Sequence, residues 1–184
     1  DREIPRLKNK IKSVQLSFMT DPFMYGFPEI EDLSLKAIKK LNDNKIKCVI
    51  LTKGILPLSL SKFSKINEYG ITLITIDEEY RKAIEPNAAP ISKRLSALKR
   101  LHEKGCNTWV SIEPYPTPNL KQQDLNEILK KISFVDKIIF GRTNYNNRIT
   151  KYKEYKTFYN NAAKLVIDFC TKHNIAYHIK DKTI

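Results

Sequence analysis

Lys53 is the charged residue of this sequence whose position is most readily tied to chemistry. It follows the apolar run Val49-Ile50-Leu51-Thr52, which has the length of a buried strand, so its ammonium group would extend from the end of that strand. A cation held at such a point suits a carboxylate or a phosphate. The alternative is a lysine that is simply solvated.

Polar residues also follow the other apolar runs. They are Thr20, Asp21 and Pro22 after the first, Thr75 to Asp77 after the third, Glu113 and Pro114 after the fourth, and Gly141 to Tyr145 after the fifth. Because the carboxyl ends of parallel strands meet at one edge of a sheet, we expect these groups to share one pocket. Plainer explanations exist: Asp21 before Pro22 could only start a turn, and Asp77 is better explained as a helix N-cap.

Two more segments could present charges to such a pocket. The loop 85–90 contains Pro86 and Pro90 and precedes Arg94, which could either reach a ligand carboxylate or pair with Glu85. Glu113 begins a loop with three prolines, which holds its shape at low entropic cost. We therefore expect Glu113 to be a preset carboxylate at the pocket rim.

The segment 142–148 has the composition of a phosphate- and base-contacting loop. Arg142 and Arg148 supply guanidinium groups, Asn144 an amide and Tyr145 an aromatic ring, although an Asn-rich turn explains the segment equally well. The net charge of +13 favours nucleic acid as a partner, but lysines scattered over solvated helices would give the same charge.

Apolar runs and amphipathic stretches alternate along the whole chain. We predict strands at 14–18, 48–51, 71–76, 108–112, 137–140 and 175–179, and helices at 33–41, 58–68, 91–103, 120–132 and 152–171. Gly70 and Gly105 are predicted helix ends. The spacing is typical of βα units in an α/β fold, either an open sheet or an arc of a (β/α) barrel. No GxGxxG or GxxxxGK[ST] motif follows the first strand, which favours the barrel.

Length and composition predict one globular domain over residues 1–184. No stretch approaches the roughly 20 apolar residues of a membrane span, and no signal-peptide core is present at the start, so we expect a cytoplasmic protein with no membrane partner. The three cysteines, Cys48, Cys106 and Cys170, have no metal-ligand spacing. Buried structural thiols in a reducing compartment are the expected role.

Five motifs occur in an order that resembles the radical S-adenosylmethionine (radical SAM) enzymes related to spore photoproduct lyase. They are Ser17-Phe18-Met19-Thr20-Asp21-Pro22-Phe23, Ile50-Leu51-Thr52-Lys53, Thr75-Ile76-Asp77-Glu78-Glu79, Glu85-Pro86, and Ala89-Pro90 with Arg94-Leu95. The resemblance extends over about residues 14–146. It implies a partial (β/α) barrel that holds S-adenosylmethionine against a [4Fe-4S] cluster and cleaves it to a 5′-deoxyadenosyl radical, with a flavodoxin or ferredoxin as reductant.

The resemblance also implies residue roles. Lys53 corresponds to a partner of the methionine carboxylate, and Thr20, Asp21 and Thr72 or Thr75 correspond to further cofactor contacts; we expect Arg94 and Glu113 to join them. We expect Arg142, Asn144, Tyr145 and Arg148 to contact the substrate, with lesion-containing nucleic acid as the family association.

One departure from the family is large. The cluster-binding CxxxCxxC motif is absent from these residues, so we expect the first strand of the family barrel to be missing and the chain alone to be inactive. The alternative function is a non-catalytic basic domain that binds nucleic acid. An acid-base enzyme on the same fold lacks a good candidate, because His102, His173 and His178 fall away from the predicted strand ends.

Overall fold

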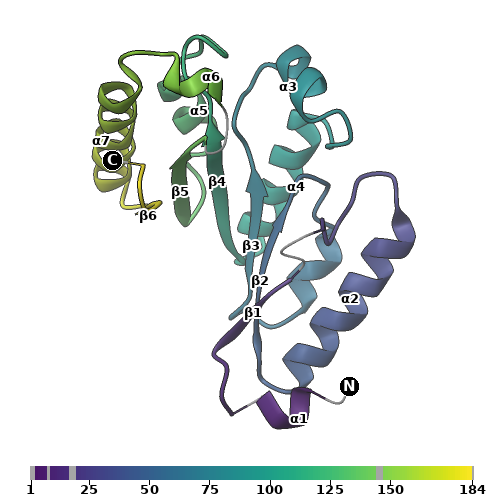
Figure 1. Ribbon diagram of the computed structural model, residues 1–184. Coiled ribbons are helices and arrows are strands. Elements are labelled where there is room, and N and C mark those ends of the chain that lie inside the picture. Colours follow the sequence, from purple (N-terminus) through teal and green to yellow (C-terminus); the bar gives the residue numbers. More distant parts are fainter. Residues whose placement is uncertain (1–2, 8, 17–19, 144–146, 184) are drawn as a thin grey trace.

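A parallel β-sheet forms the centre of the protein (Figure 1). The computed structural model describes residues 3–7, 9–16, 20–143 and 147–183. Within them the sheet has six strands, adjacent in chain order: β1 (Ser13–Gln15), β2 (Lys47–Thr52), β3 (Glu68–Thr72), β4 (Asn107–Tyr115), β5 (Lys137–Arg142) and β6 (Ala176–Ile179). Every neighbouring pair is parallel.

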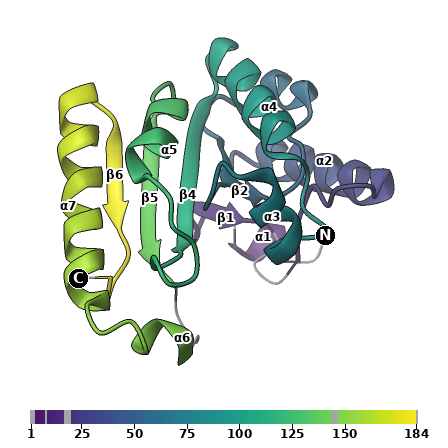
Figure 2. The ribbon, with the colours of Figure 1, turned by 90° about the horizontal axis from the view of Figure 1, so that it is seen from above.

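Seen from above, the strands follow an arc instead of a flat sheet (Figure 2). Between them lie the helices α2 (Pro28–Asp43), α4 (Ile91–Glu103), α5 (Leu125–Lys131) and α7 (Tyr155–His173). Successive parallel strands are neighbours, and right-handed crossovers then place these helices on the same face of the sheet. The other described helical segments are α1 (Ile4–Leu7), η1 (Leu58–Lys62), α3 (Glu78–Ile84) and α6 (Asn147–Thr150). The predicted α/β class and curled, barrel-like parallel sheet are confirmed.

The core lies between the sheet and these helices. In β2 the alternate residues Cys48, Ile50 and Thr52 are buried, and Ile38 of α2 is fully buried in the same core. Full burial of an Ile or Leu side chain contributes about 1.5–3 kcal/mol relative to exposure. The period-two and helical patterns of the sequence thus produce one continuous core beneath the arc.

Helix ends follow the predicted chemistry at two points. Asp77 is the N-cap of α3, and its carboxylate accepts hydrogen bonds from the amides of Glu79 and Tyr80. Gly105, after α4, has a φ of +69°, a left-handed conformation that glycine adopts without steric cost. α4 itself has the predicted bounds.

The third βα unit differs from its prediction. Only η1, Leu58–Lys62, is helical within 58–68, and the strand predicted at 71–76 is β3, Glu68–Thr72. Gly70 therefore does not end a helix. It lies inside β3, where a Cβ atom would come 2.3 Å from the Trp109 ring of β4. Glycine is required there by packing, a reason that depends on a residue 39 positions away.

The sequence predicted no membrane-spanning segment, and the helices can be checked for one. Over the residues that the structure describes, no helix combines the length and apolar character needed to cross a bilayer.

Candidate functional site

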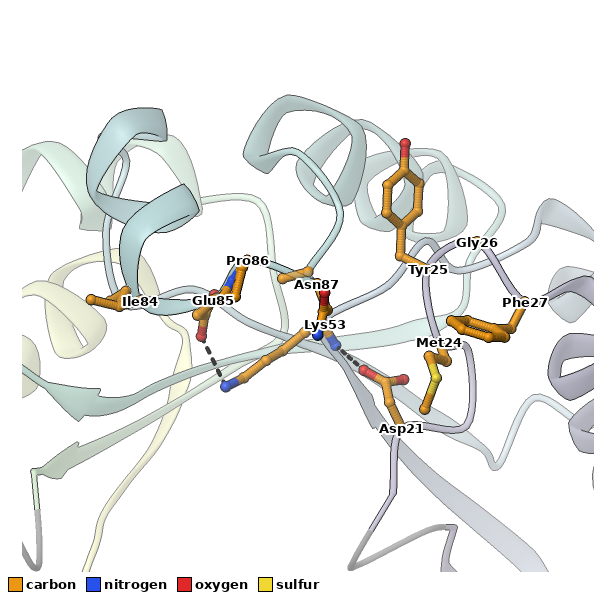
Figure 3. A pocket seen from close by; sticks show the side chains of 11 residues that line it. Asp21, Met24, Tyr25, Gly26, Phe27, Lys53, Ile84, Glu85, Pro86 and Asn87 are labelled. Atoms are coloured by element: carbon orange, nitrogen blue, oxygen red, sulfur yellow. Dashed lines mark hydrogen bonds and ion pairs between the residues drawn. The ribbon is translucent and has the colours of Figure 1, made fainter.

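A pocket of about 700 Å³ opens at the carboxyl ends of the first strands, between the loop after β1 and the connection from α3 to α4 (Figure 3). Its lining residues are Asp21, Met24, Tyr25, Gly26, Phe27, Lys53, Ile84, Glu85, Pro86, Asn87 and Ala88. The carboxyl edge of a parallel sheet is the usual ligand side of such folds. The pocket therefore brings together Asp21 and Lys53, two of the predicted site residues.

Asp21 joins the loop after β1 to the end of β2. Its Oδ2 accepts a 2.7 Å hydrogen bond from the Lys53 amide, and its Oδ1 accepts from the Thr52 hydroxyl and, at 2.9 Å, from the Phe23 amide. The turn that the sequence suggested is present, but the carboxylate also fixes the neighbouring strand. Asp21 thus sets the backbone position from which the Lys53 side chain leaves.

The Lys53 side chain crosses the pocket floor to Glu85 (Figure 3). Its Nζ lies 2.9 Å from Glu85 Oε1, and the other Glu85 oxygen, Oε2, lies 3.4 Å from Nη1 of Arg94. The Lys53 side chain is 45% exposed, whereas those of Glu85 and Arg94 are 5% and 1% exposed. One buried carboxylate therefore joins an accessible cation to a buried one.

Arg94 pairs with Glu85, which was the alternative to contact with a ligand carboxylate. Its Nη1 donates a 2.7 Å hydrogen bond to the Thr72 carbonyl as well as facing Glu85. Burial lowers the pKa of the Arg94 guanidinium, and the adjacent Glu85 carboxylate opposes that shift. Arg94 thus contacts groups inside the protein, Glu85 and the Thr72 carbonyl, and it is not among the residues that line the pocket.

The loop that carries Glu85 is held at several points. Arg81 of α3 donates from Nη1 to the carbonyls of Glu85 and Ala88, at 3.1 and 2.9 Å. The Ala89 amide donates to the Lys53 carbonyl at 2.9 Å. Lys53 is thus fixed through its amide, its carbonyl and its ammonium group, a degree of positioning typical of a binding residue.

Most of the remaining lining is apolar, and its part at residues 24–27 and Ile84 was not predicted. Tyr25, Phe27 and Ile84 line it while remaining 39%, 47% and 42% exposed. Lys93 Nζ lies 5.9 Å from the centre of the Tyr25 ring, and Gly26 between the aromatic residues has a φ of +88°. Exposed aromatic side chains around a turn glycine suit a flat ligand group. The available sequence signal was the pair Tyr25 and Phe27, four and six residues after Asp21.

Three threonines predicted to contact the cofactor are not among the residues that line this pocket: Thr20, Thr72 and Thr75. Thr20 is exposed, whereas Thr72 and Thr75 are 5% and 1% exposed. The Thr75 hydroxyl accepts a 3.1 Å hydrogen bond from the Asp77 amide. The Thr75 hydroxyl therefore stabilises the turn before α3, and the carbonyl of Thr72, at the end of β3, accepts the hydrogen bond from Arg94.

Glu113 lies on β4, away from this pocket. Its Oε2 is 3.5 Å from Lys180 Nζ, and its side chain packs where a Cβ at Gly141 would be. The Glu113–Pro114 peptide bond is cis, at a register shift between β4 and β5. The polar groups at the strand ends therefore do not share one pocket. Glu113 lies at the part of the sheet edge formed by β4 to β6, away from Lys53.

Of the predicted substrate residues, Arg142 also lies on that other part of the rim. Arg142 lines a second pocket beside α7, and the carbonyl of Arg148, whose side chain is exposed, accepts a 2.9 Å hydrogen bond from Asn119 Nδ2. Asn144 and Tyr145 lie outside the described residues.

The three cysteines do not fit an iron-sulfur cluster. Cys48 on β2, Cys106 before β4 and Cys170 on α7 are all buried and lie on different elements. Burial raises the pKa of the Cys48 and Cys170 thiols to about 11, which disfavours the thiolate that iron requires. Among the described residues no group of three His, Cys, Asp or Glu side chains is placed to hold a metal ion.

Family comparison agrees with the curled sheet and its carboxyl-edge pocket. Residues 1–132 match the model of the radical SAM superfamily, which is most of the chain, and the chain belongs to that superfamily. The superfamily implies S-adenosylmethionine and a [4Fe-4S] cluster as its cofactors.

Two curated relatives carry no functional description. The chain is 27% identical over 135 residues to the uncharacterized protein ORF301 of Acidianus two-tailed virus, covering 71% of this chain and 44% of that protein. It is 35% identical over 115 residues to the uncharacterized protein MJ0683 of Methanocaldococcus jannaschii, covering 59% and 43%. The chain therefore spans less than half the length of these relatives.

Among solved structures, SuiB of Streptococcus suis shares the fold. The SuiB crystal structure with bound S-adenosylmethionine has a TM-score of 0.68 at 17% identity, covering 97% of this chain and 42% of SuiB. SuiB bound to the precursor peptide SuiA gives 0.65 at 16% identity, covering 97% and 40%. At these identities the likeness establishes the fold alone.

Proposed function

We propose that this chain forms the cofactor-binding wall of a radical SAM enzyme and that the Lys53 pocket receives the methionine end of S-adenosylmethionine. The observation that carries this proposal is the three-point positioning of Lys53, through Asp21, Ala89 and Glu85, at the carboxyl edge of the sheet. An accessible, preset ammonium group suits a ligand carboxylate.

The charges of the pocket fit a zwitterion. The carboxylates of Asp21 and Glu85 balance Lys53 and the buried Arg94, so the carboxylate and ammonium of the methionine end add no net charge, and the sulfonium of S-adenosylmethionine adds one positive charge. In this proposal Lys53 donates to the methionine carboxylate, and the apolar rim at Tyr25 and Phe27 covers the flat adenine ring. Arg94 acts through Glu85. Direct contacts from Thr20, Thr72, Thr75 and Glu113 remain predictions.

The cluster ligands in this proposal lie outside the 184 residues, since the three cysteines present are buried and dispersed. When bound, the cluster supplies the electron that cleaves the sulfonium of S-adenosylmethionine, and a flavodoxin or ferredoxin is the proposed reductant. The contribution of this chain is to orient the sulfonium ligand and to exclude water along the apolar side of the pocket.

For the substrate we propose nucleic acid, in a reaction of the type that spore photoproduct lyase-like enzymes perform. The net charge of +13 and the basic residues at the β5–β6 part of the rim support this choice. At 16% identity, the precursor peptide bound by SuiB gives no support for a peptide substrate of this chain. The alternative, a non-catalytic nucleic-acid-binding domain, rests on the same charges.

Anaerobic reconstitution of the full-length protein with iron and sulfide separates these functions. The radical SAM proposal expects a brown protein that releases 5′-deoxyadenosine from S-adenosylmethionine on reduction with dithionite. A protein that remains colourless and yields none, while still binding oligonucleotides, would overturn the enzyme and favour the binding domain.

A further inference from the structure

Thr52, the last residue of β2, is a polar residue at a position that faces the core. The alternate residues Cys48 and Ile50 of the same strand are buried, and Thr52 itself is 2% exposed. A hydroxyl group buried at such a position lowers stability unless it is hydrogen-bonded. The partners of the Thr52 hydroxyl group therefore indicate why a polar residue stands there.

The Thr52 hydroxyl group makes two hydrogen bonds at the turn that carries Lys53. Its oxygen accepts from the Gly54 amide at 2.7 Å, and its hydrogen is donated to Oδ1 of Asp21. The first bond closes a tight turn in which Lys53 is the middle residue. The second bond ties that turn to the loop after β1. Both the donor and the acceptor capacity of this hydroxyl group are thus used to fix the backbone around Lys53.

The Asp21 carboxylate receives two further hydrogen bonds at this turn. Its Oδ2 accepts from the Lys53 amide at 2.7 Å, and its Oδ1 accepts from the Phe23 amide at 2.9 Å. Figure 3 shows the Asp21 carboxylate at the backbone end of Lys53 and Glu85 at its ammonium end. Because three donors of the protein are bonded to the Asp21 carboxylate, this side chain holds the turn and the loop together.

Gly54 allows the loop after β1 to come close to the turn. A Cβ atom at this position would lie 1.6 Å from the Phe23 carbonyl oxygen and 3.1 Å from Thr52 Oγ1. Any side chain there would push the loop and the turn apart, so glycine is required by this close approach. The approach brings Asp21 within reach of the Thr52 hydroxyl group, although the two residues are 31 positions apart in the chain.

We propose that Thr52 is a positioning residue of the Lys53 pocket. Its hydroxyl group fixes the turn from which the Lys53 side chain leaves, and so sets where the ammonium group meets a ligand carboxylate. A binding group contributes most when its supporting contacts hold it in the productive geometry before the ligand arrives. The Lys53 side chain is 45% exposed and loses rotamer freedom when it binds, so a fixed backbone reduces the remaining cost.

Thr52 acts through Lys53 in this inference, because Thr52 is not among the residues that line the pocket. The inference rests on the proposed function, in which Lys53 binds the methionine carboxylate, and it deepens that function. It also bounds the expected effect: a residue that acts through Lys53 cannot weaken binding more than the loss of Lys53 does.

The test is isothermal titration of the reconstituted full-length protein with S-adenosylmethionine. Thr52→Val keeps the shape of the side chain but neither donates nor accepts, and it is expected to weaken binding about three- to fivefold. Thr52→Ser keeps the hydroxyl group and should recover most of that loss. In the release of 5′-deoxyadenosine, Thr52→Val should raise KM and leave kcat nearly unchanged, because Lys53 contributes to binding the carboxylate.

Thr108→Val is the matched control. Thr108 is 1% exposed, and its hydroxyl group donates at 2.9 Å to Asp136, a carboxylate that also accepts from the Thr108 amide. Thr108 lies near the start of β4, at the opposite end of the sheet from the pocket. Urea unfolding should show a loss of stability similar to that of Thr52→Val, while the affinity for S-adenosylmethionine stays unchanged.

A double variant separates positioning from a general loss of stability. In a Lys53→Ala background, Thr52→Val should cause no further loss of affinity, because the residue that Thr52 positions is gone. The same loss with and without Lys53, or equal losses in Thr52→Val and Thr52→Ser, would overturn the inference. So would an unchanged affinity in Thr52→Val when Lys53→Ala weakens binding, a result that leaves the proposed function standing. Unchanged affinity in Lys53→Ala would overturn both.

Discussion

Lys53 and Glu85 form the ion pair around which the main pocket is organised. The Lys53 ammonium lies 2.9 Å from Glu85 Oε1, and the Glu85 carboxylate also faces the buried guanidinium of Arg94. Because only Lys53 of the three is substantially exposed, a ligand carboxylate that enters the pocket meets Lys53 first. The buried partners then determine where that ammonium group is held.

Lys53→Ala is expected to weaken S-adenosylmethionine binding about tenfold. A hydrogen bond between charged groups contributes about 1.5–3 kcal/mol, and the partial exposure of Lys53 places it at the lower end. Isothermal titration of the reconstituted full-length protein measures the change. Lys53→Arg keeps the charge and should recover part of the affinity, and the exposed Lys62→Ala is the control. Unchanged affinity in Lys53→Ala would remove Lys53 from the cofactor site.

Glu85→Gln is expected to lower the free energy of unfolding by about 3 kcal/mol, because it leaves the Arg94 guanidinium buried without a countercharge. Urea unfolding measures the loss. Glu79→Gln changes the same functional group at a position where the side chain is 82% exposed and should cost under about 1 kcal/mol. Similar values for both variants would show that the Glu85–Arg94 pair is not a structural element of the pocket.

Gly70→Ala is expected to destabilise the protein by about 1–3 kcal/mol, because the added methyl group would clash with the Trp109 ring at 2.3 Å. The cost should shrink when Trp109 is replaced by Leu in the same chain. Chemical unfolding of the two single variants and the double variant gives the coupling. Additive effects would contradict the packing argument for this glycine.

The buried thiols predict a reactivity order. At pH 8 a pKa of about 11 lowers the thiolate fractions of Cys48 and Cys170 about 100-fold below that of a thiol at 9.0. Burial also raises the pKa of Cys106, but Lys65 Nζ, 3.9 Å from its Sγ, opposes that shift. Cys106 should therefore react first with Ellman's reagent, and all three should react rapidly in guanidinium chloride. Fast reaction of Cys48 in the folded protein would contradict its burial.

The raised pKa values of Cys48 and Cys170 predict that the folded protein loses stability at alkaline pH. The folded protein keeps the Cys48 and Cys170 protons at pH values where the unfolded chain has released them, so unfolding releases protons and stability falls as pH rises from about 9 to about 11. Urea midpoints across this range, compared with a Cys48→Ala variant, measure the contribution. In that variant the fall with pH should be shallower.

Parts of the fold were predictable because they depend on local patterns. The helix at 91–103, the Asp77 cap and the Gly105 helix end follow from residues within a few positions of each other. The segment 58–68 was predicted wrongly as a helix. Its alternation of apolar and polar residues resembles a helical face, but the chain forms only η1 before β3 begins at Glu68.

The sequence by itself determined the α/β class with parallel strands and the placement of Asp21 and Lys53 after strands that meet at one edge. Only the tertiary structure decided which polar groups share a cavity. The sheet curves across its six described strands, so Glu113 and Arg142 lie on a different part of the rim from Lys53. Whether an arginine faces a ligand or a buried carboxylate depends on packing between distant segments, and Arg94 faces Glu85 for that reason.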